Sequence, residues 1–296
     1  MLRRFLSTLG FLSRLAPARV LCEADMRRSM FHLPLCGLVI GLCACAPVLA
    51  GLFKGMPLAQ AWLIVMLSAW MTRGLHLDGL ADVMDGAGQH LNPERFWIII
   101  KDSRSGTFGV AALVLALLGQ TALFAEILRA RPDWGAFALP WVFVFGRACA
   151  VGFGRAHRAI IRPGLGGLFL AGATVPAVAW AFGLTLFLAV LLAALPGHVP
   201  SFAPGFAPTF APALAPTFVP TFVPTFAPAP CLAVGPAFLP ALWPVLGFSV
   251  LAALAALLPL HRLARAVGGI NGDFLGAAIV LGETAAAAGL ALALCP

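Results

Sequence analysis

Residues 34–53 read PLCGLVIGLCACAPVLAGLF, a run without a single charged side chain. A helix needs about 20 apolar residues to cross a hydrocarbon core of about 30 Å. Inside lipid, the backbone polar groups of such a segment must be satisfied within the segment itself. The stretch therefore predicts a membrane-spanning α-helix. The whole chain agrees, because 61% of its 296 residues are hydrophobic, whereas soluble domains average about 45–50% apolar residues.

Further segments along the chain have the same apolar character. They cover residues 57–71, 107–128, 136–153, 173–195, 237–260 and 274–295. The first of these is short, and we expect it to extend into the loop that follows. The chain does not show the alternating polarity of a membrane β-barrel. We therefore predict an all-α, polytopic integral membrane bundle of about seven transmembrane helices, forming a single membrane-embedded domain over residues 1–296.

The distribution of positive charge predicts the orientation of these helices. With the N-terminus inside, fifteen Arg and Lys residues fall on inside segments and three on outside segments. Cytoplasmic loops of membrane proteins carry such an excess of Arg and Lys. The pattern predicts N-in and C-out, and it accounts for the net charge of +8 without nucleic-acid binding, for which we find no motif.

Residues 196–236 differ from the rest of the chain. They repeat a four-residue unit built on Phe and Pro, as in SFAPGFAPTFAP from position 201. Proline at every fourth position excludes a regular helix or a sheet ladder. We interpret the segment as an extended, low-complexity, Pro-rich extracytoplasmic loop within the domain.

Residues 76–109, HLDGLADVMDGAGQHLNPERFWIIIKDSRSGTFG, contain five of the eleven acidic side chains. Asp78, Asp82 and Asp85 are spaced so that they share one face of a helix. Three carboxylates on one face repel each other unless a cation neutralises them. Ligation by oxygen alone suits Mg²⁺ or Mn²⁺ better than Zn²⁺. The pattern favours a metal site, and the alternative is a solvated acidic loop at the membrane surface.

The segment KDSRSGTFG, residues 101–109, stands where a membrane helix is expected to begin. A helix N-terminus favours an anion, and Lys101 and Arg104 add positive charge for phosphate. Asp102 is a candidate fourth metal ligand, with Ser103 beside it. The same residue types are also ordinary helix caps, so both interpretations remain open from sequence.

Two ionisable residues fall inside apolar runs. Arg147 lies in FVFGRACAVGF, and Glu283 lies ten residues into the last predicted span. An ionisable residue within a membrane span suggests a functional site with a partner inside the bundle. For Arg147 the alternative is a side chain that reaches the inner surface.

Two more loops fall on the same predicted cytoplasmic side as the acidic segment. Arg158 and Arg162, together with Arg155 and His157, precede GLGG, and this loop resembles an anion cradle. Asn271 and Asp273 lie in GGINGDFLG, at the start of the last span. Loops that are distant in sequence can therefore form one site at one membrane face.

Several of these segments together resemble a known family. HLDGLAD at 76–82 followed by Asp85-Gly86, KDSRSGTFG at 101–109, and GGINGDFLGAAIVLGE at 268–283 resemble, in this order, the signature segments of cobalamin synthases. These enzymes are also called adenosylcobinamide-GDP ribazoletransferases. The resemblance covers nearly the whole chain outside residues 196–236.

The resemblance implies a multi-pass enzyme of the bacterial inner membrane with Mg²⁺ as cofactor. Such an enzyme transfers the adenosylcobinamide-phosphate group of adenosylcobinamide-GDP to α-ribazole or α-ribazole 5′-phosphate. GMP leaves, and adenosylcobalamin or its 5′-phosphate forms in the last steps of cobalamin (vitamin B12) biosynthesis. Membrane lipid is an implied partner, nucleic acid is not, and association with other cobalamin-assembly enzymes is left open.

For this phosphoryl transfer we assign roles to the residues above, on the predicted cytoplasmic side. Metal binding and catalysis fall to carboxylates, one of which would accept the hydroxyl proton: Asp78, Asp82, Asp85 and Asp102. Substrate contacts fall to residues of the polar loops and nearby segments: His76, Lys101, Ser103, Arg104, Arg147, Arg158, Arg162, Asn271 and Asp273.

Two other functions are weighed against this one. Asp82-x-x-Asp85-Gly86 matches the opening of the CDP-alcohol phosphotransferase motif of lipid synthesis, but Gln89-His90 stand where that motif has Ala-Arg. A non-enzymatic transporter would explain intramembrane Arg147 and Glu283, but the chain shows no internal repeat of the kind found in many transporters. Release of GMP, as opposed to solute flux, discriminates between these functions.

Overall fold

The computed structural model describes residues 2–17, 21–88, 92–102, 104–132, 134–194 and 239–294, the last range without the side chains of its first three residues. The predicted Pro-rich loop, residues 196–236, and the predicted substrate contact Ser103 lie outside the described residues.

The described residues confirm the all-α prediction. The α-helices are α1 (Leu2–Leu12), α2 (Glu23–Leu49), α3 (Pro57–Met71), α4 (Leu75–Ala87), α5 (Pro93–Ile99), α6 (Thr107–Ala130), α7 (Gly135–Ala156), α8 (Leu165–Leu170), α9 (Val175–Ala194), α10 (Leu239–Ala266) and α11 (Gly272–Leu294). A short 3₁₀ turn, η1, covers Arg158–Ile160. The strand-like pairing within the described ranges is a single parallel bridge between Ile161 and Ile270.

Six helices of the described chain are long and apolar enough to cross a membrane, namely α2, α6, α7, α9, α10 and α11. They correspond to six of the seven predicted spans. The seventh is α3, which is apolar but has 15 residues, or about 22 Å at 1.5 Å per residue. It ends where Arg73 and Gly74 both adopt positive φ angles, and α4 begins at the next residue. The expected extension of this span is therefore a separate helix.

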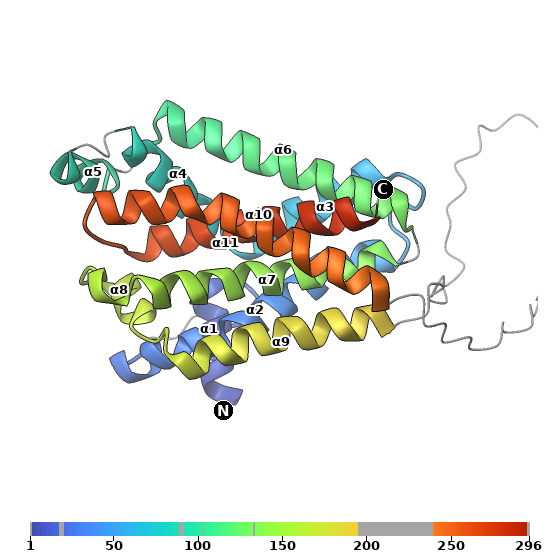
Figure 1. Ribbon diagram of the computed structural model, residues 1–296, viewed down its shortest axis with the longest axis horizontal. Coiled ribbons are helices and arrows are strands. Elements are labelled where there is room, and N and C mark those ends of the chain that lie inside the picture. Colours follow the sequence, from blue (N-terminus) through green and yellow to red (C-terminus); the bar gives the residue numbers. More distant parts are fainter. Residues whose placement is uncertain are drawn as a thin grey trace, which may run out of the picture.

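The long helices alternate in direction, so their connections fall at two ends (Figure 1). The acidic helix α4, the short helices α5 and α8, and the connection from α10 to α11 gather at one end, on the left of Figure 1. Most of the predicted site residues belong to these elements or to the segments beside them. The arrangement agrees with the expectation that separate loops meet at one face.

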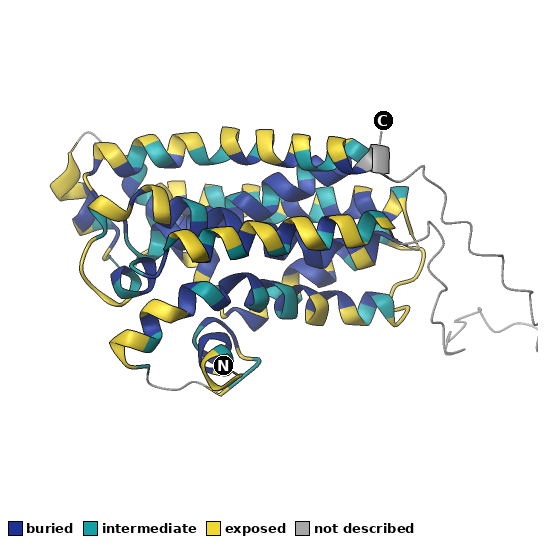
Figure 2. Ribbon diagram, turned by 60° about the horizontal axis from the view of Figure 1, so that its bottom comes forward, coloured by how far each residue is buried: buried dark blue, intermediate teal, exposed yellow. Residues whose placement is uncertain are grey.

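Helix α7 lies in the middle of the bundle, with almost all of its side chains buried. It packs against α2, α9 and α11, and α11 packs in turn against α4, α6 and α10. The outer helices carry exposed apolar side chains, such as Leu115 (72% exposed) on α6 and Leu251 (64%) on α10. Figure 2 shows these exposed stripes around a buried interior. Apolar outer faces around a packed core are what lipid solvation permits.

Candidate active site

Close packing of α4 against the start of α11 brings together two segments that are far apart in sequence. A Cβ atom at Gly79 would come within 2.8 Å of the carbonyl oxygen of Asp273. A Cβ atom at Gly276 would come within 3.1 Å of the carbonyl oxygen of His76. Because neither position has a side chain, the two backbones touch, and the acidic face of α4 lies beside Asp273.

The acidic face predicted from the spacing exists, because Asp78, Asp82 and Asp85 all belong to the continuous helix α4. The pKa of Asp82 is raised to about 7, first by burial and then by the carboxylates of Asp78, Asp273 and Asp85. Burial and like charges both disfavour the ionised form of an acid. The described residues offer no ion-pair partner to Asp78, Asp82 or Asp273. The negative charge of this group is therefore not compensated by the described residues.

A cleft of about 730 Å³ opens beside α4, and Asp78 is the member of the acidic group that lines it. Its lining combines α1, the α3–α4 turn, α4 and the region of α6: Gly10, Phe11, Arg73, Gly74, Leu75, Leu77, Asp78, Ala81, Ser105 and Leu113. Asp78 contributes an exposed carboxylate to this lining. The volume lies within the range of about 300–1,000 Å³ that is usual for small-molecule sites.

Arg73 holds α1 in place as one wall of the cleft. Its Nη2 atom donates hydrogen bonds to the carbonyl oxygens of Gly10 (2.8 Å), Phe11 (3.0 Å) and Ser13 (3.1 Å). These carbonyls lie in the last turn of α1 and just beyond it, where backbone oxygens have no partner within the helix. Sequence reasoning counted Arg73 only as an inside charge. Its contact lies about 60 residues away along the chain, which no local pattern reveals.

Asp85 has a clear structural role at the start of α6. Its two carboxylate oxygens accept hydrogen bonds from the backbone N–H groups of Gly106 and Gly109, each at 2.7 Å. A Cβ atom at either glycine would collide with that carboxylate. The glycines of GTFG are thus explained by the close approach of Asp85, which caps the positive end of α6.

Asp102 is held within its own loop. Arg104 donates to it from Nη2 at 2.7 Å and from the backbone N–H at 3.1 Å. These hydrogen bonds lower the pKa of Asp102 to about 2. Asp102 is not among the groups that raise the pKa of Asp82. Its role as a fourth metal ligand stays a prediction, and so does phosphate binding by exposed Lys101.

Asn271 orients Asp273 at the first turn of α11. The Asn271 Nδ2 atom donates to Asp273 Oδ2 at 2.6 Å, and Asn271 Oδ1 accepts from the backbone N–H of Asp273 at 3.2 Å. This is the geometry of a residue that caps a helix start. The structure thus places Asp273 beside the acidic face and gives Asn271 the function of holding it.

Arg158 and Arg162, predicted to share a phosphate cradle, contact different parts of the protein. The guanidinium of Arg162 stacks on the ring of Trp97, 4.2 Å from its centroid, and its backbone N–H donates to Ile270 at 2.9 Å. Arg158 instead borders a second cavity together with arginines of α1 and α2. The four-residue spacing of these arginines did not reveal this separation.

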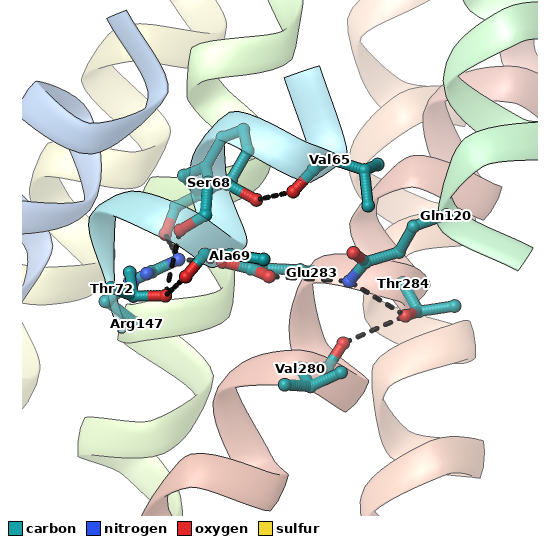
Figure 3. Close-up of polar contacts among 10 residues, drawn as sticks. Val65, Ser68, Ala69, Thr72, Gln120, Arg147, Val280, Glu283 and Thr284 are labelled. Atoms are coloured by element: carbon teal, nitrogen blue, oxygen red, sulfur yellow. Dashed lines mark hydrogen bonds and ion pairs between the residues drawn. The ribbon is translucent and has the colours of Figure 1, made fainter. Parts of the chain in front are cut away.

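Arg147 and Glu283 form a buried ion pair inside the bundle, 1% and 7% exposed. Gln120 Nε2 donates toward Glu283 Oε2 at 3.4 Å and Thr284 Oγ1 at 3.3 Å, as Figure 3 shows. The expectation that Glu283 faces a partner within the bundle is confirmed. Arg147 and Glu283 line a small cavity, and buried His76 lines it as well. Contact of Arg147 and His76 with a substrate stays a prediction.

The side chains near the cleft bear on the prediction of a metal site. Across the described ranges, no three His, Cys, Asp or Glu side chains are already arranged to hold a metal ion. The donors beside the cleft are nevertheless all oxygen atoms and carry uncompensated charge, which fits Mg²⁺. Metal binding therefore stays a prediction, with Asp78 and Asp82 as its best-placed residues.

A helical membrane protein with uncompensated carboxylates beside a cleft, and basic loops at the same end, has the features of a membrane-embedded transferase for phosphorylated substrates. A sequence model of the cobalamin-5-phosphate synthase family matches residues 4–291, so the chain belongs to this family.

Curated relatives agree with this membership. The chain is 38% identical over 291 residues to an adenosylcobinamide-GDP ribazoletransferase of Nitratidesulfovibrio vulgaris (strain DSM 19637 / Miyazaki F), with 98% of this chain and 96% of that protein covered. Proteins of the same name from Geotalea daltonii and Klebsiella pneumoniae (strain 342) are 41% and 37% identical, over 61% and 57% of this chain and 72% and 70% of theirs. No solved structure matches the chain.

Proposed function

We propose that this protein transfers the adenosylcobinamide-phosphate group of adenosylcobinamide-GDP to α-ribazole or α-ribazole 5′-phosphate, in the last steps of cobalamin biosynthesis. A hydroxyl oxygen of the ribazole attacks phosphorus, the bond to the departing phosphate of GMP breaks, and the hydroxyl proton passes to a base. The observation that carries this proposal is the group formed by Asp78, Asp82 and Asp273 without a cationic partner beside a cleft.

Each part of the site has a task in this reaction. Mg²⁺, when bound, would neutralise the charge of the diphosphate and of the departing phosphate. Asp78 and Asp82 would hold the ion, and a carboxylate not engaged by it would accept the hydroxyl proton. Asp85 positions α6 against α4, so the acidic face and the basic segment from Lys101 stay together.

We propose the bacterial inner membrane as the location, with the N-terminus and the cleft on the cytoplasmic side. Two observations support this orientation. Arg and Lys are concentrated on the segments assigned to the inside. The elements of the site gather at the end where these segments lie (Figure 1). The exposed apolar faces of α6, α9 and α10 would contact lipid.

A reconstituted assay tests the function. The purified full-length protein in lipid vesicles receives adenosylcobinamide-GDP and α-ribazole, with Mg²⁺ or with EDTA. We expect stoichiometric release of GMP and formation of adenosylcobalamin only when Mg²⁺ is present. No GMP release under any condition would contradict the proposal. If GMP release is unchanged in EDTA, the reaction does not need a metal ion, but the proposed transfer is still supported.

A further inference from the structure

A second cavity, of about 480 Å³, lies apart from the acidic cleft and has the opposite charge. Helices α1 and α2, the turn η1 and the start of α9 all contribute to its lining: Arg4, Arg27, Arg28, Phe31, His32, Arg158, Ala171, Gly172, Thr174 and Ala177. Four arginines from three separate elements therefore converge on one hollow. We call it the arginine cavity.

Most of this positive charge is not neutralised by the described residues. Arg4 pairs with Asp25 at 2.8 Å. Arg27, Arg28 and Arg158 form no ion pair with the described part of the chain. The three guanidinium groups that lack a carboxylate partner favour phosphate, which a guanidinium can bind with two parallel hydrogen bonds.

A buried histidine lines the same hollow. His32 is 5% exposed, and its Nδ1 atom is buried without a hydrogen-bond partner in the described protein. This nitrogen is enclosed by protein, so the arginines and not the imidazole provide the hydrogen-bond donors for an anion in the cavity.

The start of α9 adds a third contribution. Thr174 and Ala177 line the cavity, and the 20-residue helix α9 begins between them at Val175. Pro176 has no N–H and the N–H of Ala177 donates to Thr174 Oγ1 at 3.4 Å, so α9 contributes mainly the partial positive charge of a helix N-terminus. The turn before α9 is fixed in place, because a Cβ atom at Gly172 would collide with the carbonyl oxygen of Arg27.

An excess of arginine at the cytoplasmic ends of helices is ordinary in membrane proteins. That rule requires basic residues on one side of the membrane, and exposed Arg3, Arg155 and Arg262 satisfy it without lining this cavity. It does not require arginines from different elements to converge on one hollow with most of them unpaired by a carboxylate. The arginine cavity therefore has the features of a ligand site.

We propose that the arginine cavity binds a phosphate group and is a site separate from the acidic cleft. Two molecules could supply that phosphate, the 5′-phosphate of a ribazole substrate or the headgroup of an anionic phospholipid. Arg27 and Arg158 bind it from opposite elements. This inference does not depend on the proposed reaction, since phosphate binding can be measured without turnover.

The first experiment measures phosphate binding by the full-length protein in detergent. The midpoint of thermal unfolding is followed against sodium phosphate at constant ionic strength, with chloride as the balancing anion. We expect phosphate to stabilise the wild type, and Arg27→Gln with Arg158→Gln to weaken apparent affinity about tenfold or more. The matched control is Arg155→Gln, an exposed arginine three positions from Arg158, which should bind like the wild type.

Two arms then identify the source of the phosphate. If it belongs to the substrate, the double variant raises KM for α-ribazole 5′-phosphate about tenfold and leaves KM for α-ribazole unchanged. If it belongs to lipid, both KM values stay the same. Vesicles with phosphatidylglycerol then stabilise the wild type over phosphatidylcholine vesicles, and they do not stabilise the double variant.

The proposal is overturned if phosphate stabilises the wild type no more than chloride, or if the double variant and the Arg155→Gln control respond alike. Circular dichroism checks that the variants are folded. We expect them to fold because the replaced arginines are exposed. A wild type that binds phosphate in this cavity but releases no GMP would contradict the proposed reaction and leave this inference intact.

Discussion

The protein contains carboxylates of two kinds, which differ in whether a positive charge neutralises them. Glu283 lies in the middle of the bundle and is neutralised by Arg147. Asp78, Asp82 and Asp273 lie at one end, where the described residues neutralise none of them. The comparison teaches that charge compensation distinguishes a structural carboxylate from one that is available to a ligand. The following predictions test this distinction.

The largest effect is expected from Glu283→Ala. Removing one partner of a buried ion pair leaves Arg147 buried without a counter-charge, at a cost of about 3–5 kcal/mol. We expect poor recovery of folded protein and a sharply lower midpoint of thermal unfolding in detergent. Replacing both Arg147 and Glu283 with Leu should restore most of the stability, because well-packed apolar pairs substitute well for buried ion pairs. If Glu283→Ala were as stable as the wild type, Glu283 would have no structural role.

Replacing Asp82 is expected to reduce activity without reducing stability. Asp82→Asn should lower the rate of GMP release by about a thousandfold, since charge stabilisation by a metal is worth several kcal/mol. The variant should nevertheless be as stable as the wild type in EDTA, or more stable, because a repelled charge is removed. Asp25→Asn, which changes a carboxylate paired with Arg4, is the matched control and should retain activity. Wild-type GMP release from Asp82→Asn would refute the metal site.

Asp85 is intermediate between Glu283 and Asp82. Its neighbours are acidic, but its carboxylate accepts hydrogen bonds from backbone N–H groups. Asp85→Ala should destabilise the protein by about 1–2 kcal/mol, the usual cost of losing a helix cap. Hydrogen exchange at Gly106 and Gly109 should be faster in the variant than in the wild type, while the middle of α6 exchanges as before. Unchanged exchange at both glycines would show that the contact does not hold the helix start.

The smallest effect is a dependence of stability on pH in EDTA. The pKa of Asp82 is about 7 in the folded protein, against 3.8 for an ordinary aspartate. Between these pH values the folded state binds more protons than the unfolded chain, so the free energy of unfolding falls as pH rises. Above pH 7 this contribution is constant. Asp82 is partly exposed, so the change should be small, and it should be missing in Asp82→Asn.

Local patterns predicted a good part of this structure. The apolar runs identified six spanning helices, and the spacing of Asp78, Asp82 and Asp85 identified the acidic face of α4. Contacts between distant segments could not be predicted in this way. Asp85 and Gly106 are 21 residues apart, and no spacing rule connects a helix face to a later helix cap. Likewise, neighbouring Arg158 and Arg162 diverge because the chain turns between them.

The hydrogen bonds from Arg73 to the end of α1 have a practical consequence for anyone preparing this protein. They make the first helix part of the wall beside Asp78, so trimming residues 2–12 would remove one side of the cleft. An affinity tag fused ahead of α1 would lie close to the arginine cavity, which Arg4 lines. Helix α11 ends at the opposite end of the bundle (Figure 1), and a tag placed after it would leave both cavities accessible.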